Sequence, residues 1–590
     1  MELLGLSIFM WITILVMVGK FSLSAFTNLP GDMVSLMAIG ILLVTGTVST
    51  ELALNSFSDD SVWLILLLLV LVTGMVQSGV VDWMVKYVMG NPSSYTKALN
   101  RLMIPVALMS TILNNETIVI FFIRVVKIWC KRLKLAPSKM LLPLSYAAGL
   151  GGICTLIGTP PNIIVSYFYQ EETGQSMHIF TPFLPGICCM IVGLITINLV
   201  KNKLIPVRKS PEETFENSQD YTVELLVPTE NEAVGMTVEE AELNNVEGGH
   251  LIEIVRFDKE VISPVPSDEF ILGGDRLVYA GNIKSLLKFR RKKGLVNATH
   301  HVFSVNELDE KRQFQMVSVM PNSSLIGSSM SEMSFEEDHN VVLVAVARDG
   351  ERLNELPRDI ELCSRDILLL EGKKLNQENL QNQLLFLDNT ALPASGNKTL
   401  TATLILLGMI LLSTFNVMPL LNSCILACFF MAIFRCLSLK QIQESLNWPL
   451  LCSFAGSICL GNAISETGLS DLMAKGVIGI STNPYWALVL ICLIVTFITE
   501  FISNVGAAAV FAPVGYSIAT SLGVNPMTFM VGIMISASSS FATPGSCDTL
   551  DLITGPGGYK FSDFPRIGVP MNFIILAATV LSTLYFYPFN

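Results

Sequence analysis

Two amides and a carboxylate, Asn114, Asn115 and Glu116, lie in a stretch (residues 108–126) that is otherwise typical of a membrane segment. An unpaired polar group in hydrocarbon is costly and a charge is more so, which is why polar residues inside a membrane usually line a cavity that holds water or ions. These three residues therefore mark a candidate binding cavity.

The same kind of interruption occurs once in each half of the chain, as an amide followed some forty residues later by a small residue, Thr and Pro. The members are Asn115, Gly158, Thr159 and Pro160 in the first half, and Asn504, Ala542, Thr543 and Pro544 in the second. Paired interruptions of this kind are typical of discontinuous helices that meet near the membrane midplane and bind a transporter's cargo.

The residue types at each break suit a cation and an anion held side by side. A cation needs main-chain carbonyls released from helical hydrogen bonds plus a side-chain oxygen or two, and an anion is stabilised by helix N-termini. Asn offers a neutral acceptor. Pro160, Pro161 and Pro544 interrupt the helical path and leave carbonyls unpaired. Each break therefore supplies groups for both signs of charge.

The elements that must position these breaks are membrane helices. The 590-residue chain is 51% hydrophobic and only 15% charged, which is too apolar and too long for one soluble domain. Windows at 62–76, 183–200 and 400–415 approach the length of about 20 residues that a helix needs to cross hydrocarbon. The opening residues lack a basic leader and a cleavage site, so we expect a retained first helix rather than a signal peptide.

Composition argues against several functions. Twelve cysteines lie almost entirely in apolar segments, with only Cys363 in the polar middle, so a disulfide framework is not expected. Five histidines without a CxxC or HExxH motif give no support for a structural or catalytic metal site. We also expect no enzyme and no organic cofactor, because no nucleophile, base and orienting group can be assembled. The net charge of -12 argues against nucleic acid as a partner.

Composition shifts divide the chain into four parts. We expect a first transmembrane half at 1–204, two soluble domains with linkers at 205–300 and 301–397, and a second transmembrane half at 398–590. Basic residues lead into the insert, which by the positive-inside rule places it in the cytoplasm. They are Lys201, Lys203, Arg208 and Lys209. The expected fold class is a polytopic α-helical membrane protein with two inverted repeats and re-entrant hairpins, interrupted by tandem cytoplasmic α+β domains.

The insert contains one pattern twice. Segments 234–243, 252–258 and 274–281 match 326–335, 343–349 and 365–372 at a nearly constant offset. Alternating runs predict strands, with a short helix after Gly235 and after Gly327. The pattern resembles the TrkA-C (RCK-C) module of potassium-channel regulatory proteins over roughly 220–290 and 312–372, which implies dimerisation or a small-molecule ligand. Since the insert has no Gly-rich phosphate loop, a purely structural role stays open and we name no ligand residues.

In its membrane halves the sequence resembles the divalent anion:sodium symporter family of the ion transporter superfamily, closest to the sulfate permease branch. The resemblance rests on LNNET, PSKMLLPLSYAAGLGGICTLIGTPPN and GPGGYKFSDFPRIGVP and spans essentially the whole chain. It implies sodium ligands Ser110, Asn114, Asn115 and the Gly158 carbonyl in one site, and Thr499, the Ile502 carbonyl, Asn504 and the Ala542 carbonyl in the other. It implies anion contacts at Asn115, Glu116, Thr159, Pro160, Ser503, Asn504, Val505, Thr543 and Pro544.

Two departures from that family's pattern bear on the cargo. The third tip position, which is Thr in the family, is Glu116 in the first half and Val505 in the second. Near Leu550, where relatives often have Asn, this chain has Asp548 and Asp551. In the family the tip Thr residues help to hold a carboxylate, so their loss makes a dicarboxylate cargo less favoured than sulfate.

Glu116 is the sharpest anomaly, because an ionised Glu would repel a dianion at short range. Our hypothesis is that Glu116 binds a coupling cation or carries a proton; the alternative is that it faces the wet mouth of the hairpin without a role. Glu500 beside the second tip is a secondary candidate for pairing with a cation. The basic residues after the first hairpin are interpreted as interfacial charges. They are Lys127, Lys131, Arg132 and Lys134.

The predicted function is sodium-coupled symport of a small divalent anion, sulfate first, by alternating access. Family resemblance also implies a homodimer in the plasma membrane, or the inner membrane if the cell is bacterial. Three alternatives stay open: a proton-coupled transporter, a dicarboxylate transporter and a regulated ion channel. A channel would be favoured by a selectivity-filter string of the TVGYG kind, which the sequence lacks.

Overall fold

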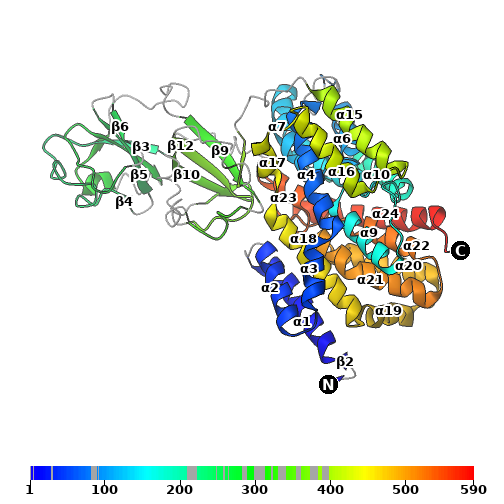
Figure 1. Ribbon diagram of the computed structural model, residues 1–590. Helices are drawn as coiled ribbons and strands as arrows, with labels where there is room; N and C mark the ends of the chain where they lie inside the picture. Colours follow the sequence, from blue (N-terminus) through cyan, green and yellow to red (C-terminus); the bar gives the residue numbers. More distant parts are fainter. Residues whose placement is uncertain are drawn as a thin grey trace. The chain divides into compact units, whose positions relative to one another are not determined.

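The computed structural model has helices at both ends of the sequence and strands in its middle (Figure 1). It describes residues 2–3, 6–27, 31–80, 90, 92, 94–208, 222–246, 249–256, 260–262, 265–281, 289–297, 313–320, 323–329, 341–353, 360–372, 380, 383–387 and 398–589. The chain forms two compact units. The first comprises Met1–Val207, Thr390–Ile553 and Phe561–Asn590, and the second comprises Arg208–Asn389 and Thr554–Lys560.

The first membrane half opens with a short hairpin, β1 (Glu2–Leu3) and β2 (Leu6–Ser7), and continues as helices. They are α1 (Ile8–Phe26), α2 (Gly31–Val44), α3 (Thr50–Ser58), α4 (Asp60–Gln77), α6 (Tyr95–Ser110), α7 (Asn115–Leu133), α8 (Ser138–Gly152), α9 (Pro160–Thr173) and α10 (Phe183–Val200). The apolar windows predicted at 62–76 and 183–200 lie in α4 and α10.

The second half is also built mainly of helices, and its helices are interrupted in the same way as those of the first half. They are α15 (Thr399–Thr414), α16 (Leu420–Ile433), α17 (Leu439–Ser445), α18 (Trp448–Glu466), α19 (Leu469–Ile480), α20 (Pro484–Ile498), α21 (Asn504–Leu522), α22 (Pro526–Ala537), α23 (Asp548–Gly557) and α24 (Asp563–Phe586). In sequence order, α6 to α10 correspond to α20 to α24, with a break at the same two places in each set.

Helices of the two halves pack against each other within the first unit. Helix α2 packs on α18, α4 on α16, α9 on α21, and α10 on α24. Close approach is possible where a glycine faces a backbone: a Cβ on Gly461 would lie 2.7 Å from the Ala509 carbonyl oxygen. Among the described residues, five helical stretches are long and apolar enough to cross a membrane. They are Thr50–Gln77, Phe183–Val200, Lys440–Glu466, Asn504–Leu522 and Asp563–Phe586.

The second unit contains two antiparallel sheets with matching strand order. The first is β6-β5-β7-β3-β8, with the short β4 also on β5, and the second is β11-β10-β12-β9-β13. The strands are β3 (Thr222–Leu226), β4 (Asn245–Val246), β5 (Gly249–Arg256), β6 (Glu260–Ile262), β7 (Arg276–Gly281), β8 (Val296–Asn297), β9 (Gln313–Val319), β10 (Val341–Arg348), β11 (Glu351–Arg352), β12 (Ile367–Gly372) and β13 (Leu384–Phe386). The pairing shifts register between Leu251 and Glu253 in one copy and between Leu343 and Ala345 in the other.

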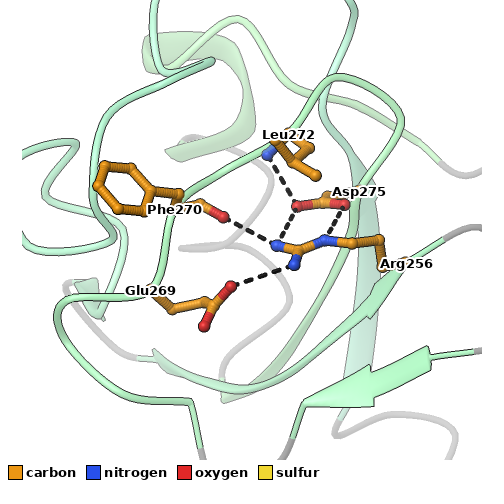
Figure 2. Close-up of polar contacts among 5 residues, drawn as sticks. All are labelled: Arg256, Glu269, Phe270, Leu272 and Asp275. Atoms are coloured by element: carbon orange, nitrogen blue, oxygen red, sulfur yellow. Dashed lines mark hydrogen bonds and ion pairs between the residues drawn. The ribbon is translucent and has the colours of Figure 1, made fainter.

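The duplication extends to an ion pair between an arginine and a buried carboxylate in each copy. Arg256 lies 3.2 Å from Asp275 and 3.1 Å from Glu269, and it donates to the Phe270 carbonyl at 2.8 Å (Figure 2). Asp275 also accepts from the Leu272 N–H at 2.9 Å. The hydrogen bond to Asp275 raises the pKa of Arg256. In this way one ion pair closes the loop that precedes β7.

The second copy repeats this arrangement. Arg348 donates from Nε and Nη2 to the two oxygens of Asp366, at 2.7 Å each, and to the Glu361 carbonyl at 2.9 Å. The Cys363 N–H donates to Asp366 at 2.8 Å. Asp366 has no exposed surface, and its hydrogen bond raises the pKa of Arg348.

The short helix that the sequence predicts after Gly235 is absent from the described residues there, which form turns instead. Ala241 N–H bonds to the Thr237 carbonyl, but Glu242 then adopts a left-handed conformation with φ of 48° and ends the turn. A single helical turn cannot extend beyond such a residue. The corresponding helix predicted after Gly327 falls on residues 330–340, outside the described part of the chain.

Candidate functional site

The first break lies between α6 and α7. Helix α6 ends at Ser110, and α7 starts at Asn115 with Asn114 as its N-cap, whose side chain accepts from the Glu116 N–H at 2.8 Å. The Thr111 carbonyl inside the break accepts from the Thr155 hydroxyl. Asn114, predicted as a sodium ligand, therefore uses its side-chain oxygen to start the helix.

Asn115 is the centre of this break. Its side chain contacts the Ser110 hydroxyl, and with the amide nitrogen turned inward it donates to the Ala148 carbonyl at 3.1 Å and the Gly158 carbonyl at 3.2 Å. Gly152 leaves the space that the amide needs, since a Cβ there would lie 2.5 Å from Asn115 Oδ1. The predicted residues Ser110, Asn115 and Gly158 thus come together.

The second break, between α20 and α21, has the same plan. The Thr499 hydroxyl contacts Asn504 Oδ1 at 2.9 Å and the Ala537 carbonyl at 2.8 Å. Ser540 donates to the same Asn504 oxygen at 2.9 Å. Ser503 caps α21 by accepting from the Gly506 N–H at 3.2 Å. The predicted pair Thr499 and Asn504 therefore meets as Ser110 and Asn115 do.

The donor sets at both breaks fit a sodium ion. At each break a hydroxyl, an amide side chain and at least one main-chain carbonyl lie within hydrogen-bond distance of one another, and at the first break the Asn115 amide presents its oxygen to this cluster when it is turned the other way round. Hard cations prefer such neutral oxygens, and carbonyls of interrupted helices supply them inside membranes. The residues that would hold the ion are Ser110, Asn115 and the Gly158 carbonyl at one break, and Thr499 and Asn504 at the other.

Glu500 is buried at the second break, with 8% of its surface exposed. It accepts from the N–H groups of Phe541 at 2.8 Å and Ala542 at 3.1 Å, and from the Asn572 side chain at 2.6 Å. The Thr543 hydroxyl contacts its carboxylate at 2.7 Å. Residues from two separate segments, 541–543 and the region of Asn572, therefore converge on one carboxylate.

Helix α8 connects the two breaks. Its Tyr146 hydroxyl donates to the Phe541 carbonyl at 2.8 Å, and its Ser145 hydroxyl lies 2.9 Å from Thr549 Oγ1. Two turns further on, the same helix contacts Asn115 through its last residues. A first-half helix thus contacts the first tip and the second Thr-Pro break, which supports the expectation that both breaks serve one site.

Glu116 lies beside Asp548, the first residue of α23, and the two side chains share a hydrogen bond. Glu116 is half-buried and Asp548 is exposed. Two carboxyl groups can hydrogen-bond only if one of them keeps its proton. The structure thus places a carboxyl group of the other half, rather than a basic residue, against Glu116.

The predicted anion contacts differ between the two Thr-Pro breaks. Thr159 is the N-cap of α9 without a side-chain capping bond, and Pro160 is the first residue of that helix. The Thr543 hydroxyl, in contrast, contacts Glu500 and lies 2.7 Å from Ser546 Oγ. The Thr159 hydroxyl is therefore more available for an anion than the Thr543 hydroxyl. Pro544 and Val505 have no polar side-chain group and make no polar side-chain contact.

The sequence interpretation missed several members of this site. Ser540, the Ala537 carbonyl, Tyr146 and Asn572 were not predicted, and Glu500 was only a secondary candidate. Glu500 alone carried a usable signal, since a carboxylate next to a tip in an apolar segment is unusual. The other contacts join residues that are up to 395 positions apart, which no local pattern indicates.

Two helical halves with paired interruptions define a polytopic membrane transporter. The family model described as "CitMHS: Citrate transporter" matches residues 9–505, and the chain belongs to this family. Membership of a transporter family confirms the prediction that the protein is not an enzyme. Membership of this citrate transporter family also confirms the expected relation to anion transporters of the ion transporter superfamily.

Similar proteins are themselves named as transporters. An uncharacterized transporter of Synechocystis sp. is 29% identical over 95% of this chain and 94% of its own length. Sodium/sulfate cotransporter 1 of Chlamydomonas reinhardtii is 26% identical over 52% of this chain and 37% of its own length. The solved structure of the Alcanivorax borkumensis YdaH transporter covers 99% of this chain and 98% of its own, with a TM-score of 0.46 and 11% identity.

Proposed function

We propose that this protein is a sodium-coupled symporter of a small divalent oxyanion, with sulfate as the preferred cargo. The observation that carries the proposal is the hydroxyl and amide pair at each break, Ser110 with Asn115 and Thr499 with Asn504. Each pair lies beside main-chain carbonyls at the end of a helix. One cation site in each half follows from this arrangement.

In this proposal the anion is bound between the breaks, close to the helix N-termini. The N-terminus of α9, with Thr159 and Pro160, supports an anion at the first break. Three further predicted contacts, Asn115, Ser503 and Asn504, lie at the starts of α7 and α21. Bound sodium offsets the anion's charge, so neither ion binds well alone and uptake is coupled. Movement of this site between the two membrane faces completes alternating access.

Two observations favour sulfate over a carboxylate cargo. The tip positions that hold carboxylates in the divalent anion:sodium symporter family are Glu116 and Val505 in this chain. Similar proteins of Chlamydomonas reinhardtii are named sodium/sulfate cotransporters. The family name supports a second candidate, a citrate or dicarboxylate transporter.

The inserted unit is the pair of TrkA-C-like domains, on the cytoplasmic side of a plasma-membrane homodimer. The matching strand orders of the two sheets support a duplicated module, and the basic residues before the insert support the orientation. A small-molecule ligand of these domains is part of this proposal.

Uptake into proteoliposomes tests the function. The full-length protein is reconstituted and radiolabelled sulfate uptake is measured with an inward sodium gradient, with the same gradient of choline, and with excess unlabelled citrate or succinate. Saturable uptake that requires sodium and resists both carboxylates supports the proposal. Sodium-dependent uptake of citrate in place of sulfate supports the second candidate, and non-saturating flux without a gradient indicates a channel.

A further inference from the structure

Glu500 is a buried carboxyl group that has no basic partner among the residues that the structure describes. It lies between the apolar helices α20 and α21, with 8% of its surface exposed. Among the ion pairs of the described residues, none involves Glu500, and all its hydrogen-bond partners are neutral. A carboxylate buried in a membrane protein without a counter-charge is costly, so such residues usually pair with a cation.

The hydrogen bonds hold the carboxylate in place as an acceptor of protein donors. Oε1 accepts from Phe541 N at 2.8 Å, Ala542 N at 3.1 Å and Asn572 Nδ2 at 2.6 Å, while Oε2 accepts from Ala542 N at 3.1 Å and lies 2.7 Å from Thr543 Oγ1. An ionised carboxylate offers about four acceptor positions. With most of these positions taken by protein donors, Glu500 has little room to coordinate an ion directly and acts instead through its charge.

A second group at the same place also lacks its partner. Asn572 is 8% exposed, and its side-chain oxygen is buried without a hydrogen-bond partner, although its nitrogen donates to Glu500. A buried acceptor without a donor costs free energy, which a nearby cation recovers. Two independent features therefore indicate a positive charge at the second break.

At the first break, the position that corresponds to Glu500 carries no charge. Glu500 follows the hydroxyl residue Thr499, and the residue that follows Ser110 in the first half is Thr111. The Thr111 carbonyl accepts from the Thr155 hydroxyl, and the Glu500 carbonyl accepts from the Thr543 hydroxyl, so the backbones correspond. Only the side-chain charge distinguishes the two positions.

We propose that Glu500 is the fixed negative charge that retains a sodium ion at Thr499 and Asn504, so that the second site binds sodium more tightly than the first. This inference rests on the proposed sodium coupling. Glu500 is a positioning residue: its charge attracts the ion, while Phe541, Ala542 and Asn572 keep that charge in place. The first site has no carboxylate next to its hydroxyl residue, and its nearest acidic side chain, Glu116, is hydrogen-bonded to Asp548, so it fills at higher sodium concentration.

Equilibrium binding of radioactive sodium to the purified full-length protein tests this inference, with choline replacing sodium to keep ionic strength constant. The variants are Glu500→Gln, which removes the charge, Glu500→Asp, which keeps it, and Asn572→Leu, which removes a neutral donor. Glu51→Gln on α3 is the matched control, because it removes an exposed carboxylate. Thermal unfolding in choline measures the stability of each variant separately from its sodium affinity.

The expected result is two-phase binding in the wild type, with the tight phase weakened about tenfold or more in Glu500→Gln. Glu500→Asp should stay within about threefold of wild type, because the charge is kept, and Asn572→Leu should weaken the tight phase less than Glu500→Gln does, because it removes a neutral oxygen but keeps the charge. Glu51→Gln should be unchanged. A purely structural role predicts lower stability in choline without a change in sodium affinity.

A folded Glu500→Gln protein with wild-type sodium affinity overturns the inference and leaves the proposed function intact. If Glu500→Gln does not fold, the other two variants decide: retained tight binding supports the inference, and a loss of tenfold or more in both overturns it. Absence of sodium binding to the wild type removes both the inference and the proposed sodium coupling.

Discussion

A single methyl group on α8 should disable the first sodium site. In Gly152→Ala the added Cβ lies 2.5 Å from Asn115 Oδ1 and 2.6 Å from Asn115 Nδ2, where ordinary contacts start at 3.4 Å. Asn115 must therefore retreat by about 1 Å. That movement separates its amide from Ser110 and from the Gly158 carbonyl, the groups with which it forms the proposed site.

The expected magnitude follows from the contacts that are lost. An amide oxygen on a cation is comparable to a hydrogen bond to a charged group, about 1.5–3 kcal/mol, so sodium affinity at the first site should fall about ten- to hundred-fold. Stability should change much less. The lost bonds to Ala148 and Gly158 cost about 2 kcal/mol, and replacing a helical glycine by alanine returns about 1 kcal/mol.

Gly149→Ala is the matched control. It lies on the same helix and its Cβ would meet Phe541 at 3.6 Å, an ordinary contact. Sodium-dependent thermal stabilisation and sodium-driven sulfate uptake are measured for both variants over a range of sodium concentrations. The reasoning fails if Gly152→Ala keeps wild-type sodium dependence, or if Gly149→Ala loses as much.

The remaining predictions concern single side chains. Thr499→Val removes a hydroxyl that contacts Asn504 at 2.9 Å, and should raise the sodium concentration for half-maximal uptake about tenfold, with wild-type stability in choline as the check. Glu116→Gln can still form a hydrogen bond to Asp548, but Gln has no carboxyl proton to exchange, so uptake should lose its pH dependence. An unchanged rate and pH profile would remove Glu116 from the mechanism. Asp366→Asn should weaken the second inserted module by about 2 kcal/mol, seen as faster hydrogen exchange in β10 and β12, whereas Asp349→Asn at an exposed position should not.

The sequence by itself located the membrane segments, both pairs of breaks and the duplicated insert. These features are local: hydropathy over about 20 residues sets a membrane helix, and proline interrupts a helix wherever it occurs. For the same reason the hydroxyl and amide pairs were predictable, since Ser110 with Asn115 and Thr499 with Asn504 are close in the chain. The prediction of a helix after Gly235 was wrong because Glu242 adopts a left-handed backbone conformation that ends the turn. The sequence pattern does not indicate that conformation.

Only the tertiary structure decided which groups complete those pairs. The sequence shows Glu500 next to a tip, but its donors come from residues 541–543 and from Asn572, and their convergence requires α20, α22 and α24 to pack in one arrangement. The same is true of Tyr146 on the second break and of Asp548 against Glu116. A charge buried in a membrane protein is tolerated only with partners, and partners far along the chain are fixed by helix packing rather than by sequence pattern.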